Sequence, residues 1–164
     1  MCSANATLDQ LTPRAPEMHH VAIQTSDVAG TIHWYETYLG AESKWTLGSF
    51  SETTTNRLPG ITCLTELKVG NLRVHVFDRG QLELSPPAPD NHQFQHLGLT
   101  VEHPEQLHYL RERWFQVRDA GTYQWQRYGE PSPIATDPDG AASLYVLDPN
   151  GLEIEFVFLP QGRE

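Results

Sequence analysis

The sequence HHVAIQT at residues 19–25 returns in altered form as QHLGLTV at residues 95–101. Each stretch places a histidine, His20 or His96, directly before an apolar run that predicts a β-strand. A segment with helical spacing of apolar residues follows in both places. Histidine packs poorly in a strand, so its return at the same position of two copies indicates a functional role.

The repetition extends to two half-chains, each with the predicted order β-α-β-β-β. In the first half, the helix begins at Ser26 or Asp27 and ends at Gly40, typical capping residues. The hairpin dipeptide Gly70-Asn71 joins its last two strands. The strands of this half are predicted at 19–25, 41–47, 61–69 and 72–77.

The second half repeats this order. Pro104 suits the first turn of a helix that is predicted to reach about Trp114. Residues 117–120 and 121–127 are predicted as strands or loop. The turn sequence DPNG at 148–151 predicts a hairpin. The strands of this half are predicted at 94–101, 143–147 and 152–159.

The chain of 164 residues is long enough to bury a core. We predict a flexible leader at 1–17 and a proline-rich linker at 81–92, which carries Pro86, Pro87 and Pro89. These segments delimit two modules, 18–80 and 93–160, and a short tail at 161–164.

Composition excludes several classes of function. A formal net charge of −10 argues against nucleic-acid binding, because too few cations face the phosphates. No apolar run approaches the roughly 20 residues of a membrane span. The N-terminus lacks the pattern of a secretory signal. With only Cys2 and Cys63, a disulfide framework is not expected, and we expect a cytoplasmic protein.

Strand alternation places polar candidates on one side of four strands. Successive side chains of a strand point to opposite faces. The runs Leu72–Phe77 and 152–159 therefore have an apolar side and a side with polar or small residues, as do the two histidine-led strands. We expect the polar sides to converge in one cavity, and the candidates they carry are His20, His75, His96 and Glu155.

Imidazoles and a carboxylate are the protein ligands that a divalent transition metal needs, with open positions left for a substrate. A metal site is therefore the first hypothesis from His20, His96 and Glu155. By alternation, His19 is expected to point away from His20 and not to bind the metal. The DPDG sequence at 137–140 is expected to be a turn, because a calcium loop needs further acidic ligands.

The chain resembles the vicinal oxygen chelate superfamily, which includes glyoxalase I, methylmalonyl-CoA epimerase, extradiol dioxygenases, and the bleomycin and fosfomycin resistance proteins. The resemblance covers roughly residues 18–159. It rests on three stretches of the sequence: HHVAIQTSDVAGTIHWYETYLGAES at 19–43, QHLGLTVEHPEQLHYLRERW at 95–114 and SLYVLDPNGLEIEF at 143–156.

The resemblance implies an α+β fold in which two βαβββ modules form a curled mixed sheet, with helices outside and a metal in a central cavity. It implies one Fe, Ni, Zn, Co or Mn ion per site and a homodimer, with a small molecule as substrate. The first and last strands of each module would supply the ligands, which by position are His20, His75, His96 and Glu155.

Three functions follow from this resemblance. The first is a glyoxalase-like lyase or isomerase, in which the metal acts as a Lewis acid toward an enolate-type intermediate. The second is an Fe(II) dioxygenase, and the third is a metal-free binding protein for a drug or natural product. Ring-cleaving relatives carry a histidine upstream of a tyrosine like Tyr145, whereas SPIATDPDGAAS at 132–143 has none.

Five residues are assigned further roles in this hypothesis. Glu155 is the candidate base as well as a ligand, and Tyr145 is a candidate proton donor. Arg73, Phe77 and Trp125 are the candidate substrate-binding residues. Together they favour a partly aromatic substrate with an oxygen or anionic group.

Overall fold

The structure is a computed structural model that describes residues 18–79, 96–127, 129–138 and 140–160. The predicted leader and tail, the predicted linker at 81–92, and Cys2 lie outside the described residues. The assigned module boundaries stay predictions.

The first module contains a four-stranded mixed sheet, sheet A. Its strands lie in the order β1-β4-β3-β2, with β1 parallel to β4 and the other neighbours antiparallel. The elements follow one another as β1 (Val21–Gln24), α1 (Val28–Leu39), β2 (Glu42–Leu47), α2 (Glu52–Arg57), β3 (Leu64–Val69) and β4 (Leu72–Phe77).

The second module repeats the arrangement in sheet B. Its order is β5-β8-β7-β6, again with the outer first strand parallel to the last one. Its elements are β5 (His96–Val101), α3 (Glu105–Asp119), β6 (Ala135–Thr136), β7 (Ala142–Leu147) and β8 (Glu153–Phe158). Equal strand order in both sheets confirms the predicted internal repeat.

Helix α1 has the ends that the sequence predicts. The Asp27 side chain accepts a hydrogen bond from the Gly30 N–H at 2.8 Å. Gly40 ends the helix with a φ of 67°, a left-handed conformation that favours glycine. These caps fix where β1 leads into the helix and where β2 leaves it.

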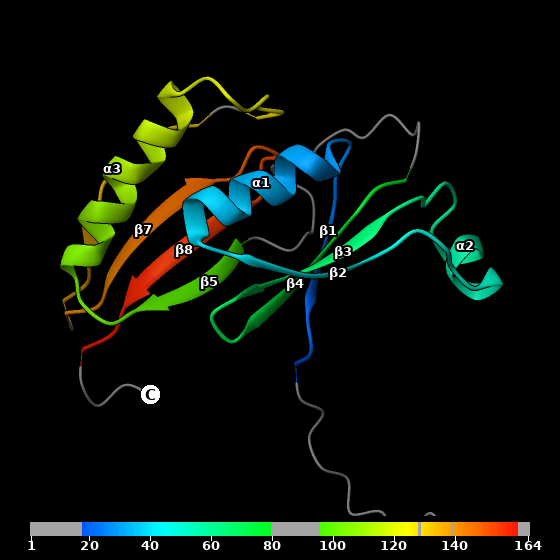
Figure 1. Ribbon diagram of the computed structural model, residues 1–164. Coiled ribbons are helices and arrows are strands. Elements are labelled where there is room, and N and C mark those ends of the chain that lie inside the picture. The colour runs from blue at the N-terminus through cyan, green and yellow to red at the C-terminus, as the bar shows by residue number, and fades with distance from the viewer. Residues whose placement is uncertain (1–17, 80–95, 128, 139, 161–164) are drawn as a thin grey trace, which may run out of the picture.

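The apolar sides of the strands form one core together with the helices. Trp34 of α1 and Trp114 of α3 are almost fully buried, as are Val74 of β4 and Ile154 of β8. In Figure 1, α1 and α3 lie on the same side of the strands, and α3 lies along β7 and β8. The opposite faces of the sheets are left for the polar side chains.

The α+β fold with two repeated modules is confirmed, but the two sheets do not close into one curled sheet. They lie apart as separate sheets in Figure 1. The expected cavity at the centre of a closed sheet is therefore not formed by the described part of one chain.

Three elements differ from the prediction. Helix α3 continues to Asp119, so residues 117–119 are helical and Ala120 is the C-cap, because Val117 is buried against the core. Helix α2, with Ser51 as its N-cap, and the two-residue strand β6 were not predicted, since both are too short to show periodicity. Residues 121–127 form loop, one of the two predicted possibilities.

Arg113 of α3 joins the two modules. Its guanidinium donates to the carbonyl oxygens of Thr37 and Tyr38, at the end of α1. In return, the Tyr38 hydroxyl donates to the Leu110 carbonyl at 3.1 Å. Among the described residues, no helix has the length and apolar character to cross a membrane.

Candidate metal centre

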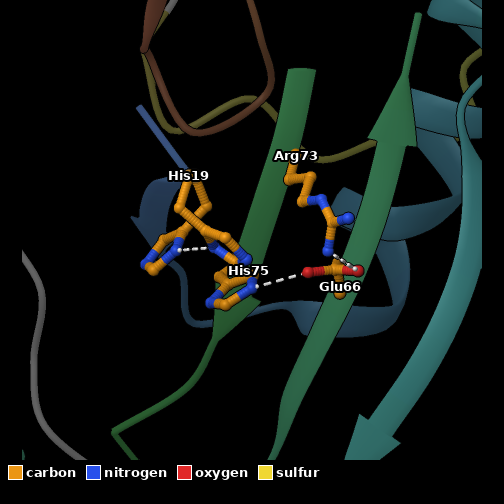
Figure 2. Close-up of polar contacts among 5 residues, drawn as sticks. His19, Glu66, Arg73 and His75 are labelled. Atoms are coloured by element: carbon orange, nitrogen blue, oxygen red, sulfur yellow. Dashed lines mark hydrogen bonds and ion pairs between the residues drawn. The ribbon is translucent and has the colours of Figure 1, made fainter. Parts of the chain in front are cut away.

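The polar face of sheet A carries a row of cross-strand partners. Glu66 of β3 pairs with His75 of β4, and Trp45 of β2 pairs with Glu66 on its other side. The His75 Nε2 lies 3.0 Å from Glu66 Oε2. Arg73 approaches the other carboxylate oxygen at 3.5 Å, as Figure 2 shows. Glu66 is thus a buried carboxylate held between two basic side chains.

His20 lies against this row from the segment that leads into β1. Its ring stacks on the ring of His75, with 3.8 Å between centroids and 14° between planes. The His19 Nδ1 lies 2.9 Å from the His20 Nδ1. The ligand atoms of His19, His20 and His75 all lie within 4.8 Å of one another. Three imidazoles therefore gather at one edge of sheet A.

The expectation that His19 points away from His20 is wrong. That expectation applied strand alternation to both residues, but β1 begins only at Val21. His19 and His20 precede the strand, and the alternation of the pleat does not govern them. Figure 2 shows the His19 ring directed toward the neighbouring imidazole.

Charges within this cluster shift the pKa values of two members. Partial desolvation, with His75 and His19 nearby, lowers the pKa of His20. The hydrogen bond from His75 and the charge of Arg73 lower the pKa of Glu66 against the opposing effect of desolvation. Both shifts favour the forms in which metal sites use such groups, a neutral imidazole and a carboxylate.

The polar face of sheet B carries the second cluster. The His96 Nε2 lies 3.1 Å from Glu155 Oε2. The other carboxylate oxygen accepts hydrogen bonds from the Tyr145 hydroxyl at 2.7 Å and the Ser143 hydroxyl at 2.9 Å. The Glu153 Oε1 lies 3.8 Å from the His96 Nδ1. Glu155 is therefore held from one side and open toward His96 on the other.

The spacing of His96 and Glu155 fits adjacent ligands of one ion. Bonds of about 2.1 Å that meet at a right angle place two donor atoms roughly 3 Å apart. Gly98 lies opposite Glu155 in the ladder, and a Cβ at Gly98 would lie 3.9 Å from Glu155 Oε2, an ordinary contact distance. Hydrogen bonding to Glu155 raises the pKa of Tyr145.

The two clusters lie at equivalent places in the repeat. His75 pairs with Ala22 of β1, two residues after His20, and Glu155 pairs with Gly98 of β5, two residues after His96. Within the described residues, however, no group of three potential ligands that joins both modules has its donor atoms within 4.8 Å. The predicted ligands of one chain thus lie in two separate pairs, His20 with His75 and His96 with Glu155, which are called half-sites below.

A family model for the Glyoxalase/Bleomycin resistance protein/Dioxygenase superfamily matches residues 17–156. The chain belongs to this superfamily. The match includes both half-sites. A comparison with curated proteins gives no significant match.

Solved structures share the fold of this superfamily member. It aligns with a glyoxylase/bleomycin resistance protein/dioxygenase domain from Frankia sp. EAN1pec at a TM-score of 0.69 and 16% identity, covering 92% of this chain and 96% of the other. A lactoylglutathione lyase from Agrobacterium tumefaciens aligns at a TM-score of 0.58 and 17% identity, covering 92% and 100%. The fosfomycin resistance protein FosX from Listeria monocytogenes, complexed with Mn(II) and sulfate, aligns at a TM-score of 0.56 and 11% identity. The alignment covers 90% of this chain and 96% of the other.

The candidate substrate-binding residues lie in three different settings. Arg73 is half-exposed beside Glu66, on the same sheet as His75. Phe77 is buried at the end of β4. The centroid of the Trp125 ring lies 5.1 Å from that of Trp114, which belongs to helix α3. Their role in substrate binding stays a prediction.

Sequence reasoning missed Glu66, Ser143 and His19. The first two are found only from strand register, because Glu66 lies beside His75 and Ser143 lies across a hairpin from Glu155. A signal existed for Glu66, the one carboxylate in the strand sequence LTELKV. A buried carboxylate needs a basic or hydrogen-bonding partner, and here the partners are His75 and Arg73 of the neighbouring strand.

A groove of about 450 Å³ lies elsewhere, between the modules. It is lined by the end of α1, the β3–β4 turn, β5 and α3, including Tyr109 and Arg113. None of the predicted ligands lines this groove, and Arg113 uses its donors on the carbonyls of α1 and on Tyr109. The metal hypothesis therefore concerns the sheet faces.

Proposed function

We propose that this protein is a metal-dependent lyase or isomerase that acts on a small molecule with neighbouring oxygen atoms. The observation that carries the proposal is the contact of His96 Nε2 with Glu155 Oε2 at 3.1 Å, beside the hydroxyl of Tyr145. A bound divalent ion supplies Lewis-acid stabilisation of the negative charge that develops on the substrate oxygens.

The residues of sheet B divide the remaining tasks. Glu155 offers Oε2 as a ligand, while Tyr145 and Ser143 hold Oε1 and fix the orientation of the carboxylate. The Tyr145 hydroxyl donates to Glu155 Oε1, and this hydrogen bond raises the pKa of Tyr145. In this proposal the phenol is the proton donor, and Glu155 is the group that accepts a proton from the substrate.

His20 and His75 supply the remaining ligands in this proposal. Both imidazoles lie on the polar face of sheet A, where His75 is oriented by Glu66. The Mn(II) in the FosX structure and the lyase activity named for the Agrobacterium protein support a divalent metal and a lyase reaction.

We further propose a homodimer in which a second copy joins the half-sites. The polar faces carry exposed residues in both modules: Trp45 is 38% exposed on sheet A, and Gly98 is exposed on sheet B. A second copy that lays its sheet B against sheet A would bring His96 and Glu155 toward His20. Burying two open sheet faces also provides contact area for a dimer.

An Fe(II) dioxygenase is the second candidate, because His20, His96 and Glu155 form the two-histidine, one-carboxylate set that serves oxygen chemistry. Oxygen consumption separates the two candidates. Protein loaded with Fe(II) and given a panel of catechols consumes no oxygen if it is a lyase or isomerase. Stoichiometric consumption would overturn the lyase assignment in favour of the oxygenase.

Single substitutions test the ligand set. We expect His20→Ala, His96→Ala and Glu155→Ala each to lose bound metal and at least about 100-fold in kcat/KM. His33→Ala is the matched control, since this imidazole lies on α1 and contacts Tyr123, away from both half-sites. Full activity of the Glu155 variant would refute the proposal. Undiminished binding of a natural product by metal-free protein would instead indicate a binding protein.

A further inference from the structure

The turn between β7 and β8, residues 148–151, contacts the end of β1 and the first half of α1 in the other module. We propose that this contact, the turn joint, is proton-dependent: it stays closed while Asp148 is neutral and opens when Asp148 ionises. The turn joint consists of Thr25, Thr31 and Tyr35 in the first module with Asp148 and Asn150 in the second. The inference concerns how the modules are held together and does not depend on a bound metal.

A closed ring of three hydrogen bonds crosses the turn joint. The Thr25 hydroxyl, just after β1, donates to Asn150 Oδ1 at 2.6 Å. The Asn150 amide group donates to Thr31 Oγ1 at 2.9 Å. Because the Thr25 hydroxyl has one proton, Thr31 is the donor in the 3.0 Å contact between the two hydroxyls. Both threonines are buried, so a broken ring leaves polar groups without partners unless water enters.

The carboxyl of Asp148 lies beside this ring and is fully buried. Its Oδ1 accepts a hydrogen bond from the Leu152 N–H at 2.8 Å, which closes the turn. Its Oδ2 accepts hydrogen bonds from the Tyr35 hydroxyl of α1 at 3.3 Å and from the Asn150 amide at 3.4 Å. The same carboxyl therefore holds the turn together and connects it to the first module.

The groups around Asp148 provide no countercharge. Tyr35 is the titratable group that faces it from α1, and Trp114 of α3 contacts the carbonyl of the preceding residue. Asp27, before α1, and Arg127, whose stem lies against the turn, are exposed. Among the described residues, no ion pair includes Asp148. An ionised Asp148 is therefore a buried charge between the modules, which is unfavourable.

Ionisation of Asp148 therefore favours an open joint. Burial raises the pKa of this carboxyl from 3.8 to about 6 while the joint is closed. Opening exposes the carboxyl to water, where its ordinary pKa returns. The open state is disfavoured below about pH 4, gains population as the pH rises to about 6, and gains no more above that value. Linkage gives an increase in opening of roughly 10-fold to 100-fold between pH 4 and 7.

Helix α1 is held by the second module at its other end as well. The guanidinium of Arg113 donates to the carbonyls of Thr37 and Tyr38, and a guanidinium stays charged throughout this pH range. Opening of the turn joint thus lets β1 and α1 pivot about the Arg113 contact while the modules remain joined. Because the two half-sites lie in different modules, this movement changes the distance between them.

Amide hydrogen exchange measured residue by residue tests the turn joint. The Leu152 N–H donates to Asp148 and the Asp27 N–H donates to Thr25 Oγ1 at 3.0 Å, so both exchange when the joint opens. We expect their protection, corrected for the intrinsic effect of pH on exchange, to fall roughly 10-fold to 100-fold between pH 4 and 7. Asp148→Asn abolishes this dependence. Local opening also leaves both amides less protected than those of the β3–β4 ladder and insensitive to low urea.

Substitutions in the first module test whether the contact crosses between modules. Thr25→Val removes the hydroxyl from the ring, and we expect the protection of the Leu152 amide to fall about 10-fold. Thr25→Ser, which keeps the hydroxyl, restores it. Thr65→Val is the matched control, because Thr65 is also buried and contacts the hydroxyl of Thr46 at 2.9 Å within sheet A. This variant leaves the protection of Leu152 unchanged.

Three results would each overturn the inference: protection of the Leu152 amide that does not change with pH, equal protection of this amide in Thr25→Val and Thr65→Val, or exchange of the joint amides only through global unfolding. Circular dichroism establishes that every variant is folded. These results leave the proposed function standing, because that function is judged by the metal content and activity of the His96 and Glu155 variants.

Discussion

Glu66 and Tyr145 occupy equivalent positions in the two modules. Glu66 pairs with His75 across β3 and β4, and Tyr145 pairs with Glu155 across β7 and β8. Each hydrogen-bonds to the residue that it faces, at 3.0 and 2.7 Å. The two modules thus share the same cross-strand pairing but differ in the side chains that it brings together. A carboxylate hydrogen-bonds to an imidazole in the first module, and a phenol hydrogen-bonds to a carboxylate in the second.

The support of Glu155 by Tyr145 gives the first prediction. Tyr145→Phe removes the hydroxyl that donates to Glu155 Oε1. Outer partners of metal ligands typically contribute 10-fold to 100-fold to affinity or activity. We expect a loss of about that size in kcat, with a smaller change in metal content. Tyr123→Phe, which removes a hydroxyl bonded to His33, is the control for activity. Equal kcat for both variants would contradict the role of Tyr145.

Gly98 gives a prediction about access to Glu155. A Cβ at this position would meet Glu155 Oε2 at ordinary contact distance, so Gly98→Ala leaves the carboxylate accessible. The branched side chain of Gly98→Val covers it while suiting a strand. We therefore expect metal content to fall several-fold in the valine variant only, with folding intact by circular dichroism. Equal metal content in both variants would show that metal does not reach Glu155 from this side.

The buried carboxyl of Asp148 gives a prediction about pH. Asp148 lies at the turn between β7 and β8, where it accepts hydrogen bonds from Leu152 N–H and Tyr35. Burial raises its pKa from 3.8 to about 6. At pH values between about 4 and 6, the Asp148 carboxyl is therefore protonated in the folded chain and ionised in the unfolded chain. The contribution of Asp148 to the free energy of unfolding is therefore largest below about pH 4 and declines as the pH rises to about 6.

Urea denaturation from pH 4 to 7 measures this effect. Asp148→Asn removes the titrating group, so the free energy of unfolding of the wild type should decline relative to the variant by roughly 1–3 kcal/mol across this range. The comparison uses the slope of the free energy of unfolding against pH, because the substitution also changes this free energy by an amount that does not depend on pH. Parallel curves for the two proteins would show that Asp148 does not titrate in this range.

Arg113 gives a prediction about the contact between modules. Arg113→Ala removes the donors to the Thr37 and Tyr38 carbonyls, which leaves the end of α1 without these partners. Hydrogen bonds to charged groups contribute about 1.5–3 kcal/mol. We expect a loss of about 2 kcal/mol in the free energy of unfolding. Arg111→Ala, on the same helix, loses a more exposed ion pair and is expected to cost about 1 kcal/mol or less.

The repeated fold could be predicted because its signals are local. The capping residues Asp27 and Gly40 and the turn Gly70-Asn71 each specify one backbone conformation, and the structure contains all three. The end of α3 was predicted too early, since residues 117–120 suit either a strand or a helix until the core that buries Val117 is known.

The pairing of the site residues depends on contacts that no local pattern contains. Alternation predicts that His75 shares a face with Arg73, but not that Glu66 of the next strand binds both. The position of His19 escaped prediction because it precedes the strand whose alternation was applied to it. The expected convergence of His20 and His96 required the two sheets to close on each other, an arrangement that sequence periodicity does not specify.

Anomalous X-ray scattering from a crystal of protein purified without chelator tests the central proposal most directly, because it identifies the ion and locates it. We predict a peak within about 2.0–2.2 Å of His96 Nε2 and Glu155 Oε2, with His20 completing the site from the same chain or a second copy. A metal-loaded crystal whose map shows no peak beside Glu155 would contradict the account.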